Sequence, residues 1–253
     1  MIDSINHVNF MDFNPDGIEK PISTSPQGYD LHTLGKVSYE QFCKFLDNLD
    51  QENETWGLDL QAMENRKEWF EVNKRKCQGN FILLDGDEII ALYTAYNWLF
   101  MDKYDDISAK YIFFKDFLNL EVQSLDDSID YKNLVAHVYS YVVKKEYQKQ
   151  GLGHFGLAIM INFKTFQALK GIIDDNGDSV NMDLVFHVAR THTYNLGSRF
   201  LLKKLGFIPI QKINSANHIT YCFAVDKNEN IAQLQTDSKI DLDEDLYNLK
   251  KED

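Results

Sequence analysis

Residues Val135–Lys170 carry the strongest structural signal in the chain and read VAHVYSYVVKKEYQKQGLGHFGLAIMINFKTFQALK. Its beginning, Val135–Val143, is rich in β-branched and aromatic side chains and has the composition and length of a buried strand. The polar segment Lys144–Gln150 and the glycines of Gly151–Gly153 follow. After the glycines, apolar residues recur at helical spacing. The predicted order is therefore strand, glycine-bearing turn, helix.

A turn of this kind suits a phosphate ligand. The first backbone N–H groups of a helix have no partner inside the helix, and the helix dipole adds partial positive charge at the same end. Glycines allow a positive φ and let the backbone approach a ligand closely. We therefore expect Gln148–His154 to bind an anion, in the first place a pyrophosphate.

Two motifs narrow this expectation. Gln148–Gly153 fits the pattern (Arg/Gln)-x-x-Gly-x-(Gly/Ala), and Asn195–Phe207 reads NLGSRFLLKKLGF. In this order the two motifs resemble the GCN5-related N-acetyltransferase (GNAT) superfamily, whose downstream motif is Asn-x-x-(Ala/Ser)…Tyr-x-Lys-Leu-Gly-Phe. This sequence departs from the family pattern twice, because Lys145 stands at the usual proline and Leu202 at the usual tyrosine.

The resemblance implies an α/β fold with a mixed, mostly antiparallel sheet, splayed at the strands Val135–Val143 and Asp183–Ala189, and helices on both faces. It also implies acetyl-CoA as the acyl donor. The residues that the resemblance assigns to acetyl-CoA binding are Tyr141, Val142 and Val143 at the strand end, Gln148, Lys149, Gln150, Gly151, Leu152, Gly153 and His154 in the turn, and Asn195.

Several side chains are candidates for proton transfer. His137 stands where some histone acetyltransferases of the superfamily carry a glutamate base, and a histidine titrates near working pH; a hydrogen-bonded core histidine is the alternative. Tyr139 and Tyr141 share its strand face and could line the acceptor pocket, relay a proton through water or simply pack. Because Leu202 cannot donate a proton, Ser198 or Tyr194 could act instead. The thiolate could also leave unaided, since a thiol has a pKa near ~8.5.

A dinucleotide site is the competing interpretation of the glycines. Gly151–Gly156 reads GxGxxG, and Asp174 or Asp175 lies near the expected acidic position. A dinucleotide-binding strand, however, runs directly into its first glycine, whereas here Lys144–Gln150 intervenes. No series of strand–helix–strand repeats surrounds the motif, so we disfavour a nicotinamide cofactor.

The rest of the chain predicts one domain with elaborations. Its 253 residues, 44% of them hydrophobic, suffice for a sizeable core. We expect an N-terminal arm (1–28), a GNAT-like domain (29–225) and an acidic tail (226–253) with a short amphipathic helix. Within the domain we expect helices after Ser38 and over 61–77, a hairpin at Asp85–Asp87, and a final hairpin over 207–225.

An insertion at 98–133 combines aromatic rings with carboxylates. This combination suits a cationic amine, although the same residues could cover the sheet and face solvent.

Charge and cysteine content limit the kinds of partner and the cellular compartment that the sequence is compatible with. The net charge of −13 argues against nucleic acid and is compatible with a cationic substrate. Cys43, Cys77 and Cys222 are scattered, which indicates reduced thiols in the cytoplasm and no disulfide or metal framework. We find no membrane-spanning run and no basic-then-apolar leader, and we expect no membrane association. The sequence leaves a homodimer open.

The sequence therefore predicts an enzyme that transfers an acetyl group directly from acetyl-CoA to a primary amine. A small cationic amine is the preferred acceptor, and a protein N-terminus or lysine is the alternative. A catalytically weak acyl-CoA-binding regulatory module is the alternative of a different class, because of Leu202.

Overall fold

The predicted strand–turn–helix unit lies at the centre of the protein, which we describe from a computed structural model. The structure describes residues 20–50, 65–74, 79–101, 133–173, 179–213, 218–227 and 231–232. The strands are β1 (Ser23–Thr24), β2 (Asp30–Thr33), β3 (Phe81–Asp85), β4 (Glu88–Met101), β5 (Asn133–Val143), β6 (Ile172–Ile173), β7 (Ser179–Val180), β8 (Leu184–His192), β9 (Ile208–Ile213), β10 (His218–Asp226) and β11 (Ile231–Ala232). The helices are α1 (Tyr39–Asp50), α3 (Arg66–Asn73), α5 (Leu152–Lys170) and α6 (Leu196–Lys204), with short 3₁₀ helices η2 (Leu34–Lys36) and η7 (Lys145–Tyr147).

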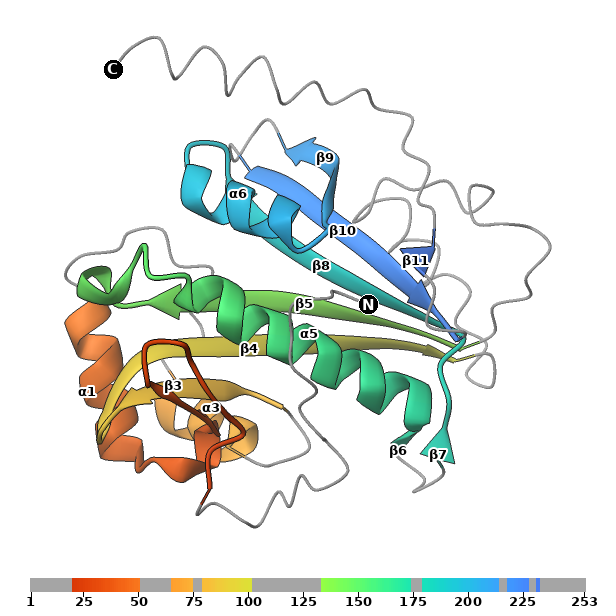
Figure 1. Cartoon of the computed structure of the whole chain (residues 1–253). Coiled ribbons are helices and arrows are strands. Elements are labelled where there is room, and N and C mark those ends of the chain that lie inside the picture. Colours follow the sequence, from red (N-terminus) through yellow and green to blue (C-terminus); the bar gives the residue numbers. More distant parts are fainter. Residues whose placement is uncertain are drawn as a thin grey trace, which may run out of the picture.

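The main sheet has the order β1-β2-β3-β4-β5-β8-β10-β11, with β9 paired to β10 (Figure 1). Among the described strands, β5 and β8 form the one parallel pair, and their pairing ends at Tyr139 and Ala189. Beyond this point β5 continues along β4 as far as Val143, and β8 continues along β10 as far as His192. The two central strands therefore part from each other, as predicted, and Figure 1 shows them diverging toward the start of α5.

Helices cover both faces of the sheet because side chains alternate along each strand. On β3, Phe81 and Leu83 belong to the core beneath α5 and α6, whereas Ile82 and Leu84 belong to the core beneath α1 and α3. Phe42 of α1 stacks on Trp69 of α3, with ring centroids 5.4 Å apart. The predicted fold class, a mixed and mostly antiparallel sheet between helices, is confirmed.

Local signals account for several element ends. Ser38 caps α1 by accepting from the N–H of Gln41 at 3.2 Å, and the Gln41 side chain accepts from the N–H of Ser38 at 2.9 Å. Gly206 follows α6 with a φ of 87°, which suits a glycine after a helix. The hairpins at Asp85–Asp87 and between β9 and β10 are also confirmed.

Two strands differ from the prediction. β4 continues to Met101, into the predicted insertion at 98–133, where it pairs with the start of β5. Polar Asn97 does not interrupt it, because its side chain bonds to the cross-strand residue His137. The predicted N-terminal arm contributes β1, which pairs with β2 at the sheet edge.

Several predictions fall outside the described residues. They concern the aromatic and acidic insertion from 102 to 132, the tail helix, Cys77 and the acidic pair Asp174 and Asp175. Within the described ranges, no helix is long and apolar enough to cross a membrane.

Candidate functional site

The turn between β5 and α5 exposes the start of a helix. Lys149 and Gly151 both have a positive φ, 63° and 79°, which turns the chain sharply after η7. The N–H of Phe155 bonds to the carbonyl of Gly151 at 3.0 Å, so the amides before Phe155 have no helical acceptor. No described side chain caps this end, and no acidic residue lies in its first turn. The start of α5 is therefore a positive, amide-rich end that suits an anion.

Glycines place α5 close to its neighbours. A Cβ on Gly156 would lie 2.1 Å from the Tyr93 ring, and a Cβ on Gly153 would lie 2.8 Å from a methyl group of Leu201 in α6. Tyr93 also donates to the carbonyl of Leu152 at 2.8 Å. The glycine string is thus explained by close packing of the first turn against β4 and α6, together with the positive φ of Gly151.

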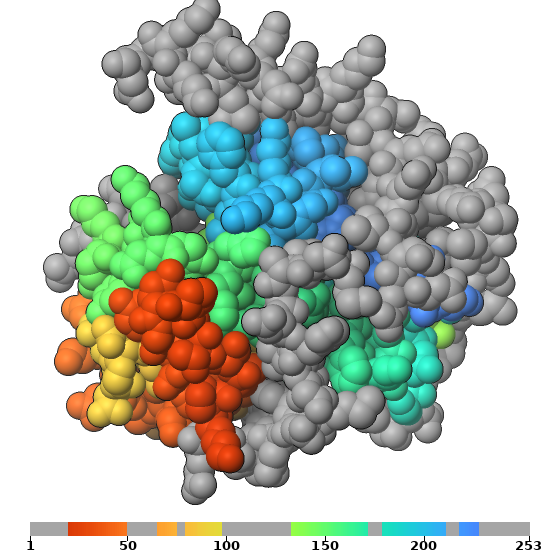
Figure 2. All heavy atoms as spheres, viewed as in Figure 1, coloured from red at the N-terminus to blue at the C-terminus, as the bar shows by residue number. Residues whose placement is uncertain are grey.

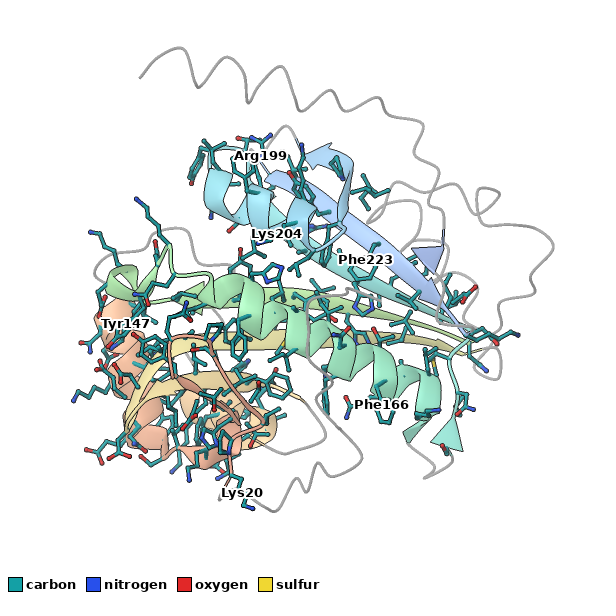
Figure 3. The ribbon with its side chains drawn as sticks, viewed as in Figure 1. Lys20, Tyr147, Phe166, Arg199, Lys204 and Phe223 are labelled. Atoms are coloured by element: carbon teal, nitrogen blue, oxygen red, sulfur yellow. The ribbon has the colours of Figure 1, made fainter. Side chains whose placement is uncertain are left out.

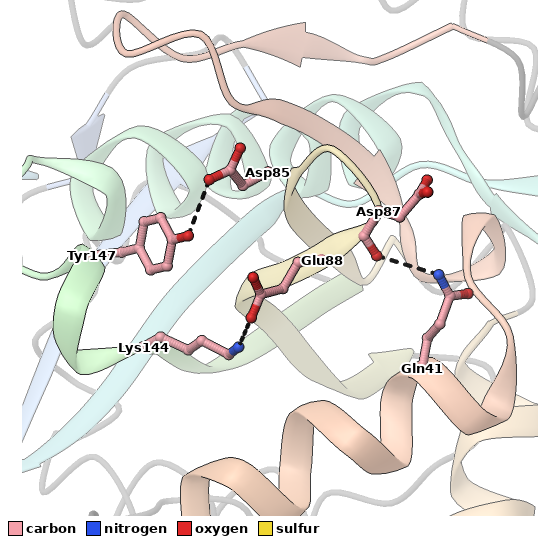
Figure 4. A network of polar contacts seen from close by, with 6 residues as sticks. All are labelled: Gln41, Asp85, Asp87, Glu88, Lys144 and Tyr147. Atoms are coloured by element: carbon pink, nitrogen blue, oxygen red, sulfur yellow. Dashed lines mark hydrogen bonds and ion pairs between the residues drawn. The ribbon is translucent and has the colours of Figure 1, made fainter.

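The β3–β4 hairpin holds the same turn from the side (Figure 4). Lys144 forms an ion pair with Glu88, and the Tyr147 hydroxyl donates to Asp85 at 3.0 Å. The backbone carbonyl of Asp87 accepts from Gln41 of α1 at 3.3 Å. The hairpin therefore links α1 to the polar segment before the glycines. No sequence motif indicated these contacts.

The N-terminal segment meets the turn as well. The Gln27 side chain donates to the carbonyl of Gln150 at 2.8 Å, and the rings of Tyr29 and Tyr147 pack edge to face with centroids 5.6 Å apart. Figure 2 shows this segment lying against the turn. Within the turn, Gln148 donates to the carbonyl of Val143 at 3.0 Å. The turn is therefore held by the arm, the hairpin and its own side chains.

The opening between β5 and β8 lies next to this turn. Val142 and Val143 pair with β4 but not with β8, so their other backbone edge faces the opening. Across the opening, the Tyr141 hydroxyl donates to Ser198 Oγ of α6 at 2.8 Å. The Asn195 side chain caps α6 by accepting from the N–H of Ser198 at 3.1 Å. The structure thus brings together three residues that the sequence analysis proposed separately.

His137 lies inside the sheet's α5 face and is only 2% exposed. Its Nδ1 bonds to Asn97 Oδ1 at 2.8 Å, whereas its buried Nε2 has no hydrogen-bond partner. Burial, with Lys164 and His187 nearby, holds the pKa of His137 well below its usual range. The ring is therefore neutral and carries an unused lone pair. These surroundings are those of a core histidine, and its role as a base stays a prediction.

Tyr139 belongs to a second buried chain of hydrogen bonds. Its hydroxyl lies 2.7 Å from His187 Nδ1, and Thr165 Oγ1 lies 2.9 Å from His187 Nε2. Because the Thr165 hydroxyl donates to the carbonyl of Ile161, it must accept from Nε2–H, so Tyr139 donates to Nδ1. Burial lowers the pKa of His187 to about 3 and raises that of Tyr139.

Leu202 and His154 complete the candidate residues. Leu202 is 1% exposed and belongs to the core, so it offers nothing to a ligand. His154 lies in the first turn of α5, where burial and the nearby Lys204 lower its pKa. Lys204, labelled in Figure 3, thus adds positive charge from α6 near the start of α5. Within the described ranges, no group of three or more His, Cys, Asp or Glu side chains could hold a metal.

No family model and no curated protein matches the sequence. Solved structures with a similar architecture include a ribosomal-protein-S5-alanine acetyltransferase from Vibrio fischeri, which is 13% identical, covers 77% of this chain and 91% of its own, and has a TM-score of 0.45. A GNAT family acetyltransferase from Streptococcus pneumoniae is 12% identical over 81% and 99% of the two chains, with a TM-score of 0.46. The Salmonella typhimurium protein yncA, solved with its cofactor acetyl-CoA, is 13% identical over 81% and 98%, with a TM-score of 0.44. The chain's single described parallel pair, which parts beside the start of α5, is the splayed pair of strands that the sequence resemblance implies.

Proposed function

We propose that this chain is a GNAT-type N-acetyltransferase that transfers an acetyl group directly from acetyl-CoA to a primary amine. The observation that supports it best is the position of the opening between β5 and β8 directly beside the uncapped start of α5. The turn is suited to a pyrophosphate and the strand edge to an extended amide-containing arm. Acetyl-CoA carries both groups, so one ligand fits both features.

Binding would rest mainly on backbone groups. The amides from Gly151 to His154 would hold the pyrophosphate, with Lys149 and Lys204 adding positive charge. The free edge of Tyr141–Val143 would pair with the arm and supply an N–H for the developing oxyanion. Because Asn195 holds the start of α6, it would keep the opposite side of the opening in place.

Proton transfer is assigned to side chains on the α5 face of β5. His137 is the proposed base because its Nε2 lone pair is unused, and Tyr139 with His187 is the alternative relay. If His137 is the base, His137→Asn should lower turnover strongly while leaving acetyl-CoA affinity unchanged. An unchanged turnover would limit His137 to a packing role.

A small cationic amine is the proposed acceptor, since the net charge of −13 attracts cations over long range. Salt screens such attraction, so the KM of a diamine should rise as ionic strength increases from about 0.01 to 0.15 M, where the screening length falls from about 30 to 8 Å. A KM that does not respond to salt would favour the protein-amine alternative. We place the protein in the cytoplasm on the basis of its scattered cysteines.

Calorimetric titration with acetyl-CoA, CoA and NAD tests the proposal first. We expect acetyl-CoA and CoA to bind and NAD to give no heat. A panel of polyamines, aminoglycosides, arylalkylamines and peptides is then screened for thiol release. Binding without thiol release from any amine would support the regulatory module. Absence of binding to either CoA species would overturn the proposal.

A further inference from the structure

The replacement of the usual tyrosine by Leu202 leaves the departing thiolate without its expected donor. Leu202 is buried in the core, so no small movement of this side chain would supply one. We propose that Tyr141 and Ser198 form a donor pair that stabilises the thiolate of CoA as it leaves. The inference rests on the proposed acetyl transfer and assigns a function to the Tyr141 hydroxyl, which the motifs did not indicate.

The position of the pair carries the argument. Tyr141 lies just beyond the last parallel pair, Tyr139 and Ala189, and Ser198 lies in the first turn of α6. Their 2.8 Å hydrogen bond therefore joins β5 to α6 beside the opening between β5 and β8. The Tyr141 ring also borders the first turn of α5, since a Cβ on Gly153 would lie 3.4 Å from it. The two hydroxyls thus lie between the phosphate turn and the point where β5 and β8 part.

The Tyr141–Ser198 pair has one hydroxyl proton that is not used in the hydrogen bond between the two residues. Tyr141 donates to Ser198 Oγ, so the proton of Ser198 is not used within the pair. Accepting a hydrogen bond makes the Ser198 hydroxyl a better donor in turn. Burial raises the pKa of Tyr141, although its bond to Ser198 opposes this shift. The Tyr141 hydroxyl therefore keeps its proton at neutral pH.

The acetyl-transfer step needs no reagent besides acetyl-CoA, the amine and solvent. The amine nitrogen bonds to the thioester carbon, the carbon–sulfur bond breaks, and the sulfur keeps the electron pair. The Ser198 O–H donates a hydrogen bond to this sulfur, and the amine proton leaves to the base or to water. Full proton transfer from the pair is not required, because a thiol has a pKa of about 8.5 and a tyrosine one of about 10. Solvent then supplies the thiol proton.

Variants of the pair test the inference through turnover and affinity together. We expect Tyr141→Phe and Ser198→Ala each to lower kcat by about tenfold to a hundredfold, the range for a lost donor or proton-transfer group. The Kd for acetyl-CoA should stay within about twofold. Because the residues act as one unit, the double variant should be no slower than the slower single variant. Ser198→Thr keeps the hydroxyl and should restore most of kcat.

Tyr221→Phe is the matched control. Tyr221 is also a buried strand tyrosine, but its hydroxyl lies near Arg199 and is not part of the donor pair, so its removal should leave kcat unchanged. If the wild-type protein turns over an amine and kcat is the same in Tyr141→Phe and Ser198→Ala, the donor pair is refuted while the acetyltransferase stands. A loss of acetyl-CoA affinity alone would also refute it. A wild-type protein that acetylates no amine would refute the proposed function itself.

Discussion

Gly151 has the backbone conformation on which the turn before α5 depends. Its φ is 79°, which L residues with a side chain rarely adopt, and no atom lies within 4 Å of an ideal Cβ at this position. A larger residue would therefore fit sterically but would strain the backbone by about 1 kcal/mol. Relief of that strain would rotate the amides that follow Gly151.

We predict that Gly151→Ala weakens acetyl-CoA binding by roughly tenfold, which corresponds to about 1.4 kcal/mol. Gly206→Ala is the matched control, because Gly206 has a similar φ of 87° and equally open surroundings, but follows the far end of α6. Urea unfolding should show similar losses of stability in both variants, and calorimetry should show weaker binding only in the first. Equal acetyl-CoA affinities in the two variants would show that the conformation of Gly151 does not contribute to binding.

At the scale of elements, the β3–β4 hairpin and the turn before α5 are joined by an ion pair of unequal exposure. The side chain of Lys144 is 7% exposed, whereas that of Glu88 is 55% exposed. An ammonium this deeply buried depends on its partner, although the exposed carboxylate limits the strength of the pair. The pair therefore restrains the start of the turn that leads into α5.

We predict that Glu88→Gln lowers the free energy of unfolding by about 1 kcal/mol and weakens acetyl-CoA binding. Asp87→Asn is the control. It removes the same charge from the residue next to Glu88 and keeps the backbone carbonyl that accepts from Gln41. Denaturant unfolding and calorimetry on both variants separate the ion pair from the change in net charge. Identical behaviour of the two would mean that Lys144 does not restrain the turn.

At the scale of the whole molecule, the core beneath α5 holds a titratable group in its neutral form. Burial lowers the pKa of His187 to about 3, against 6.5 for an unburied histidine. Its ring lies between Tyr139 and Phe223, at centroid distances of 5.7 and 4.6 Å. Between these two pKa values the unfolded chain binds one more proton than the folded protein at this residue. Stability from His187 is therefore present above pH 6.5 and is lost as the pH falls toward 3.

We predict that the wild-type free energy of unfolding falls more steeply than that of His187→Gln between pH 6 and 3. One differential proton corresponds to a slope difference of about 1.4 kcal/mol per pH unit. Because both proteins share the remaining charges, the difference between their curves isolates His187. Parallel curves would show that His187 does not titrate differently on folding.

Local chemistry explains what could be predicted without the structure. The strand, the glycine turn and the helix of Val135–Lys170 follow from side-chain periodicity and from the backbone freedom of glycine. The cap at Ser38 and the end of α6 at Gly206 likewise depend on neighbours within a few residues. The motifs at Gln148–Gly153 and Asn195–Phe207 indicated the fold class for the same reason, since each combines a helix end with fixed turn chemistry.

Long-range packing decided the rest. Alternation along β5 places His137, Tyr139 and Tyr141 on one face, but only the packing of α5 shows that His137 is buried. Tyr141 and Ser198 are 57 residues apart, and Lys144 and Glu88 are 56 apart. Periodicity states which residues share a face, whereas the partner across that face depends on how distant elements pack. The sequence therefore predicted the glycine turn and the sheet class correctly, whereas the packing of distant elements decided which hydroxyls and charges surround the opening.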